Sequence, residues 1–129
     1  MGRWGWIAGS VLGVAMMMGQ ARAQDADTTA DVRCLVVSVS MVASQQQNQQ
    51  TAGLMSALYF LGRLDGRRPD LDLENRLVDE VTKLKPEQLR EEAVRCGALL
   101  KERGKALTDM GARISQRGHE MQRHDEQKN

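Results

Sequence analysis

The amino-acid sequence predicts an all-α fold: a small four-helix domain clasped by one disulfide bond, with a long C-terminal helix and a frayed tail. Three observations lead to this prediction. Apolar residues recur three and four positions apart along most of the chain, which is the spacing of an amphipathic helix. A strand-like segment occurs only once, and a lone strand has nothing to pair with. The chain has just two cysteines, Cys34 and Cys96, far apart in the sequence.

The first 23 residues have the three parts of a secretory signal peptide. Arg3 gives a basic start, an apolar stretch covers 7–18, and Ala21 and Ala23 form a cleavage site of the Ala-x-Ala type. The apolar stretch is shorter than the roughly 20 residues that a membrane-spanning helix needs. We therefore expect cleavage after Ala23, a periplasmic or secreted protein, and no stable membrane anchor after cleavage.

The charge of the expected mature chain argues against nucleic acid as a partner. Of the 18 Lys and Arg residues, Arg3 and Arg22 leave with the signal, so 16 basic residues face 17 acidic ones and the net charge is −1. A nearly neutral chain has no long-range field that attracts nucleic acid or an anionic membrane. Both tryptophans also leave, so Tyr59 and Phe60 are the only aromatic residues that remain to stack on bases.

The mature chain is long enough for one domain but not for a generous core, so a covalent staple is expected. Cys34 and Cys96 are the only candidates, and disulfides form in oxidising compartments outside the cytoplasm. By loop-closure entropy such a bond stabilises the domain by on the order of 4 kcal/mol. Two buried thiols or half of a metal site are the alternatives.

The first two helices follow from the apolar pattern. After a loose leader over 24–30, apolar residues at helical spacing predict a helix over about 31–47, although the valines in this segment also alternate as in a strand. The second helix covers about 51–64 and has almost no polar face, so we expect it in the middle of the packing. Gly66 is expected to end it in the left-handed conformation, with Pro69 preventing its continuation.

Capping residues mark the last two helices. Asp70 or Asp72 is expected to start the third, and Pro86 suits the first position of the fourth. No proline interrupts the fourth helix before the C-terminus. We expect the helical domain to cover 31–114 and the polar residues 115–129 to be disordered.

The last helix carries a seven-residue repeat of apolar residues and, beside them, of glycines. The repeat consists of Ala93, Leu100, Leu107, Ile114 and Met121, with Gly97, Gly104, Gly111 and Gly118. Such a repeat keeps one stripe on one side of a helix, and small residues permit close approach of another backbone. A docking seam for another helix or a second copy is one interpretation. Fraying is the other, because each internal glycine costs about 1 kcal/mol relative to alanine.

No arrangement of residues predicts catalysis, a cofactor or a metal site. His119 and His124 are five residues apart, whereas helical metal pairs use three or four. No serine lies in a Gly-x-Ser-x-Gly turn. We therefore expect a protein that is not an enzyme.

Three arginines gather near a glycine-containing connection: Arg63, Arg67 and Arg68. Arginines in this number can grip a carboxylate or phosphate through paired hydrogen bonds, which makes them a candidate anion or partner site. The alternative is a self-paired loop, because Asp65, Asp70 and Asp72 are close in sequence.

Several of these features together resemble the small periplasmic acid-stress chaperones of the HdeA/HdeB kind. The features are the signal, Cys34 on a first helix, the stretch Tyr59-Phe60-Leu61-Gly62-Arg63-Leu64-Asp65-Gly66, Pro86 opening a later helix, and Cys96 within it. The resemblance covers about 31–100 and implies an all-helical, disulfide-clasped fold, with a homodimer as one arrangement. The longer segment between the cysteines and the extra residues after 100 depart from that family.

The expected function is that of an exported, non-catalytic binding protein of the stress or chaperone type, which offers apolar surface to protein clients. The alternative is a dedicated protein partner, such as an inhibitor, an immunity factor or an assembly subunit. Binding to many unrelated clients would favour the first function, and a single co-purifying partner would favour the second.

The processing of the chain can be tested by intact mass. We expect the exported protein, measured without reductant, to begin at Gln24 and to weigh less than its reduced form by two hydrogen atoms. Native material with two freely alkylated thiols, or with an intact N-terminus, would contradict this prediction.

Overall fold

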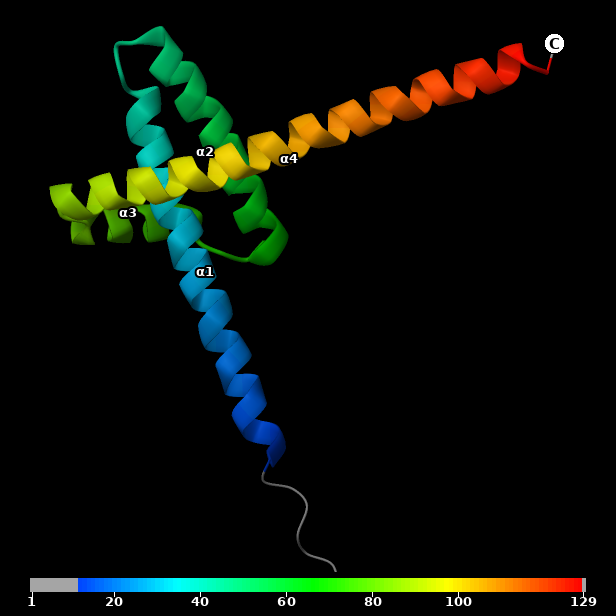
Figure 1. The fold of residues 1–129 in the computed structure, drawn as a ribbon. Coiled ribbons are helices and arrows are strands. Elements are labelled where there is room, and N and C mark those ends of the chain that lie inside the picture. The colour runs from blue at the N-terminus through cyan, green and yellow to red at the C-terminus, as the bar shows by residue number, and fades with distance from the viewer. Residues whose placement is uncertain (1–11, 129) are drawn as a thin grey trace, which may run out of the picture. The chain divides into compact units, whose positions relative to one another are not determined.

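The computed structural model describes residues 12–128 and contains four α-helices (Figure 1). They are α1 (Leu12–Val42), α2 (Gln47–Arg67), α3 (Leu73–Lys83) and α4 (Pro86–Glu126). No strand occurs in this part of the chain, and Cys34 is disulfide-bonded to Cys96, so the all-α prediction with one disulfide is confirmed. The chain divides into two compact units, one ending at Lys83 and the other beginning at Leu84, and the disulfide joins them covalently.

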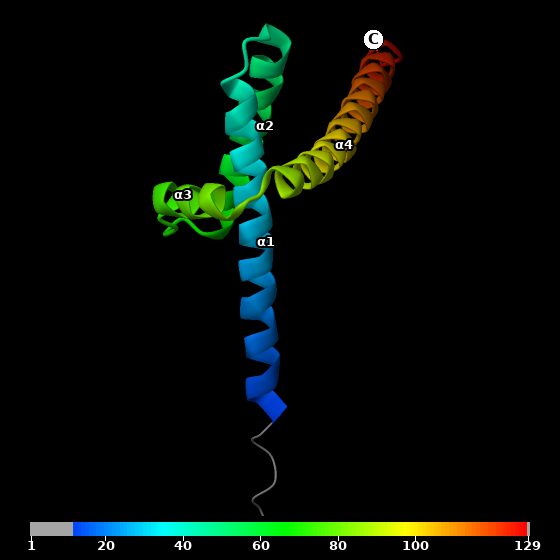
Figure 2. The same ribbon diagram turned by 90° about the vertical axis from the view of Figure 1, so that its left-hand side faces the viewer.

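The first unit is built on α1. Helix α2 runs alongside the C-terminal half of α1, and α3 packs against α1 as well (Figure 1 and Figure 2). Its core contains Val32 and Leu35 from α1 and Phe60 and Leu64 from α2. The ring of Tyr59 meets that of Phe60 edge to face, with centroids 5.1 Å apart. The core is small because α2 contributes few large buried side chains.

At Gly53 the backbones of α1 and α2 approach each other closely. A Cβ atom at this position would lie 2.8 Å from the Met41 Cβ and 2.9 Å from the Ser38 carbonyl oxygen, which is closer than real Cβ contacts. Nearby, the hydroxyls of Ser38 and Ser56 are 2.6 Å apart and buried, and Ser38 also donates to the Cys34 carbonyl. Small side chains therefore set the distance between the two helices.

Helix α1 differs from the helix expected over 31–47. Residues 24–30, expected as a loose leader, are helical, and the helix ends at Val42. Contacts hold the leader in this form: Thr28 is buried, and Thr29 accepts a hydrogen bond from Arg76 of α3 at 2.7 Å. Residues 12–23 of the expected signal form the start of α1, and residues 1–11 lie outside the described part of the chain.

Helix α2 is longer than expected, and only one side of it is buried. It continues through Gly66, whose backbone is not left-handed, and stops at Arg67. Arg68 then has φ −140° and ψ 69°, because the residue before Pro69 cannot easily stay helical. Leu58 is 60% exposed, so the expectation that this helix lies in the middle of the packing is wrong.

Helix α3 begins at one of the two expected caps and turns one side inward. The Asp72 carboxylate accepts the Asn75 backbone N–H at 3.2 Å. Leu77 is half-buried and Glu80 is buried, whereas Val78 is exposed. Leu77 and Glu80 are three residues apart and share one side of the helix, so the inner side of α3 combines apolar residues with the ion pairs of Glu80.

The second unit consists essentially of α4. Pro86 opens the helix as expected, and the Lys85 backbone N–H donates to the Gln88 side chain at 3.0 Å in a capping box. The helix continues through Glu126, so the described residues of the segment 115–129, expected to be disordered, are almost all helical. Arginine, glutamine and methionine in this segment favour helix, which offsets part of the cost of its one glycine. Cys96 is the one buried residue of α4.

The contact at Gly53 predicts opposite effects for two glycine substitutions in α2. Gly53→Ala should lower the free energy of unfolding by about 1–3 kcal/mol, because its Cβ forces the helices apart. Gly62→Ala should raise it by up to about 1 kcal/mol, because a Cβ there meets open space and alanine favours helix. Urea unfolding of both variants measures the difference. Equal stability of Gly53→Ala and the natural protein would contradict the close approach.

Candidate functional site

The predicted arginine cluster lies on the last two turns of α2 and at its end. Two of its members, Arg63 and Arg67, bind Asp31 of α1. The Arg63 Nε is 3.1 and 3.0 Å from the two carboxylate oxygens, and the Arg67 Nη1 is 2.8 Å from Oδ2. Asp31 is only 1% exposed, so its charge must be paired inside the protein. This group of three residues, the Asp31 clasp, fastens α1 to α2.

Arg63 is further held by Tyr59, one turn earlier in α2. Its Nη1 donates to the Tyr59 hydroxyl at 3.1 Å, and its guanidinium carbon lies 5.6 Å from the centre of the ring. Burial by itself lowers the pKa of Arg63, but the hydrogen bonds to Asp31 and Tyr59 and the charge of Asp31 outweigh it. The net result is a raised pKa. Arg63 is therefore charged at every pH at which the protein is folded.

Arg68, the third member, is paired more loosely at the surface. Its guanidinium nitrogens lie 3.6 Å from Asp25 and 3.5 Å from Asp70. Of the three carboxylates expected to neutralise the cluster, only Asp70 pairs with it among the ion pairs found, and α1 supplies the others. Because all three arginines have carboxylate partners in the same chain, their arrangement favours a structural clasp over an open anion site.

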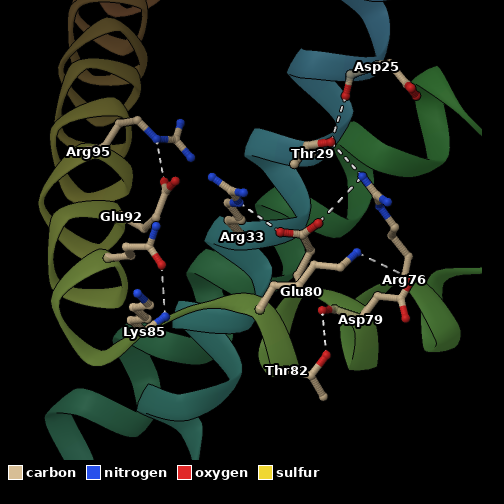
Figure 3. A network of polar contacts seen from close by, with 12 residues as sticks. Asp25, Thr29, Arg33, Arg76, Asp79, Glu80, Thr82, Lys85, Glu92 and Arg95 are labelled. Atoms are coloured by element: carbon tan, nitrogen blue, oxygen red, sulfur yellow. Dashed lines mark hydrogen bonds and ion pairs between the residues drawn. The ribbon is translucent and has the colours of Figure 1, made fainter.

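A second buried carboxylate, Glu80, joins α3 to α1 (Figure 3). Its oxygens lie 2.9 Å from the Arg33 Nε and 3.7 Å from the Arg76 Nη2, and Glu80 is 3% exposed. Arg76 also donates to Thr29, so it links the carboxylate to a second position on α1. The first unit is thus held by two buried acidic groups, each between two arginines.

The sequence interpretation did not single out Asp31 or Glu80. For both, the neighbouring residues in the sequence provide an indication. Asp31 directly precedes the buried run that starts at Val32, and Glu80 lies between Val78 and Val81. A charged residue beside apolar ones is a candidate for a buried ion pair, but only the packing identifies which charge is buried and which residues are its partners.

The candidate docking seam lies along α4. Its glycines, Gly97, Gly104 and Gly111, have open space where a Cβ would be. Leu107 is 69% exposed, whereas Leu100 is half-buried. The seam residues share one helix and one register, so the structure brings them into a single stripe.

A second apolar surface covers the side of α2 that is turned away from its buried face. It is formed by Leu54, Met55 and Leu58, which are 53%, 68% and 60% exposed. We call these three residues the α2 face. Apolar side chains that gather on a surface in this way mark contact sites for other molecules.

The described residues contain no group of three or more His, Cys, Asp or Glu side chains that could hold a metal ion. Within the same part of the chain, no helix is both long and apolar enough to cross a membrane. Comparisons with models of protein families, with curated proteins and with solved structures found no match to this chain. The functional argument therefore depends on the surfaces and the buried ion pairs described above.

The Asp31 clasp predicts a large effect for a small substitution. Asp31→Asn removes the negative charge between Arg63 and Arg67, and the two partly buried cations then repel each other. We expect a loss of about 2–3 kcal/mol in the free energy of unfolding, below the full cost of breaking a buried pair because both arginines are partly exposed.

The matched control is Asp109→Asn, which breaks the exposed pair with Lys105 on α4. Its effect should stay within about 0.5 kcal/mol. Denaturant unfolding of both variants at neutral pH measures the two losses. Similar losses in the two variants would mean that the Asp31 clasp does not hold α1 to α2.

Proposed function

We propose that this chain is an exported, non-catalytic binding protein that protects partly unfolded client proteins in the periplasm under stress. The observation that carries the proposal is the α2 face, where three neighbouring apolar residues remain exposed beside a small core. Apolar attraction has no direction and is proportional to the area removed from water, so such a face suits clients of differing sequence. Met55 adds an unbranched, polarisable side chain that adapts to irregular partners.

Export is supported by the signal-like N-terminus and by the disulfide. A bond between Cys34 and Cys96 is of the kind that forms and persists in oxidising compartments. The resemblance of the sequence to periplasmic acid-stress chaperones supports the same location. It also implies a response to acid.

The charge balance of the chain provides a physical route to that response. At pH 2–3 carboxylates in general become protonated while arginines keep their charge, so the chain becomes strongly positive. Repulsion among its cations would then loosen the packing of α2 and α3 on α1. The Cys34–Cys96 bond would still hold α1 and α4 together while the apolar residues near α2 become accessible.

The proposal is tested with an aggregation assay on the oxidised protein. It should suppress the aggregation of unrelated clients, more strongly at pH 2–3 than at neutral pH. Leu58→Asp should weaken this suppression because it places a charge within the α2 face. The same substitution should change the free energy of unfolding at neutral pH by no more than about 0.5 kcal/mol, because Leu58 is largely exposed.

Gln47→Asp is the matched control, since it adds the same charge at an exposed polar position of α2. It should leave the suppression unchanged. If the oxidised protein fails to suppress aggregation at either pH, or if Leu58→Asp acts no differently from Gln47→Asp, the proposal is wrong. Recovery of one defined partner from the periplasm would then favour a dedicated binding function.

A further inference from the structure

The glycines and large apolar residues along α4 follow a regular spacing that the fold of the chain does not need. Glycines and large apolar residues alternate at intervals of three and four, which are the intervals of the two inward-facing positions of a coiled coil. We call this set the α4 seam: Gly97, Leu100, Gly104, Leu107, Gly111, Ile114, Gly118 and Met121. We propose that the α4 seam pairs with that of a second copy of this chain, with the two helices antiparallel.

The antiparallel direction follows from the order of small and large residues. When one helix is reversed about Asp109, Gly111 lies opposite Leu107 of the second copy, and Gly104 lies opposite Ile114. The outer glycines of the seam face Met121 and Leu100 in the same way. Every layer then combines one large residue with one glycine, so a side chain fills the space that the missing Cβ leaves. Parallel helices would instead place glycine against glycine and leucine against leucine, with gaps in alternate layers.

No contact within the chain explains why the α4 seam contains glycines. A Cβ at any of Gly97, Gly104, Gly111 and Gly118 would meet nothing within 4 Å. Each glycine nevertheless costs about 1 kcal/mol of helix stability relative to alanine. Close approach of another backbone gives these positions a function that alanine would serve less well.

Three of the four large residues of the α4 seam have the exposure that a docking surface needs. Leu107, Ile114 and Met121 are 69%, 64% and 64% exposed. Two copies that cover these side chains and the glycines between them bury on the order of 1,000 Å² in total, which is near the lower limit for a specific interface. The area therefore fits a weak dimer that depends on concentration.

The charges beside the α4 seam predict different effects of salt for a second copy and for an acidic partner. In the antiparallel pair Arg103 of one helix lies near Arg117 of the other. None of the positions that border the seam on the helix surface, which are 101, 103, 108, 110, 115 and 117, holds an acidic residue. Like charges repel, and salt screens this repulsion. Pairing of two copies should therefore strengthen as salt is added, whereas binding to an acidic helix or an anionic surface would weaken.

Sedimentation equilibrium of the oxidised mature protein tests the pairing. We expect reversible dimers whose association constant rises with salt. The double variant Gly104→Gln, Gly111→Gln should weaken association by about tenfold or more. Glutamine favours helix more than glycine does, so circular dichroism should show no loss of helix. The control is Ala112→Gln, which lies outside the α4 seam and should leave association unchanged. A monomer at all concentrations, or association that falls with salt, would overturn the proposal.

Cross-linking tests the direction of the helices. Near the centre of the antiparallel pair the two Met110 residues lie beside each other, whereas the two Met121 residues lie at opposite ends. Met110→Cys should therefore form a disulfide-linked dimer readily and Met121→Cys should not, with Cys34 and Cys96 bonded in both variants. Faster cross-linking through position 121 would show parallel helices and overturn the antiparallel arrangement.

Discussion

The Asp31 carboxylate is almost completely buried, and its two arginine partners come from a different helix. An ionised group in that position must be paired, because an isolated charge away from water costs several kcal/mol. Arg63 and Arg67 can reach it only when α2 lies alongside α1 and remains helical through Arg67. The pairing therefore fixes the position of α2 along α1. Glu80 of α3 has the same role through Arg33 of α1.

Polar pairs and small residues carry much of the packing in this unit. Gly53 and the Ser38–Ser56 contact bring α1 and α2 close together, so few large apolar side chains fit between them. The remaining apolar residues of α2 consequently face outward. An interface held by charge depends on pH and salt more than one held by an apolar core. This dependence is the physical link between the architecture and the proposed binding function.

The two exposed apolar surfaces differ in their regularity, and the difference suits different partners. The α2 face is a short group without a repeat that includes the flexible Met55, and it matches no particular shape. The α4 seam contains four seven-residue repeats, and only a helix with the same repeat can match it throughout. Variable clients suit the first surface, and a second copy of the chain suits the second.

The sequence by itself determined the helical class, the cysteine pair and the opening of α4 at Pro86, and it narrowed the cap of α3 to Asp70 or Asp72. Each of these depends on local spacing, on backbone preference or on the number of cysteines. Only the tertiary structure decided that Leu58 is exposed, that Glu80 is buried, and that Arg63 and Arg67 share Asp31. Periodicity shows that a helix has an apolar side, but α2 is apolar nearly all round, so its pattern could not select a face. That choice came from the contact at Gly53 and from pairing between residues more than 30 positions apart.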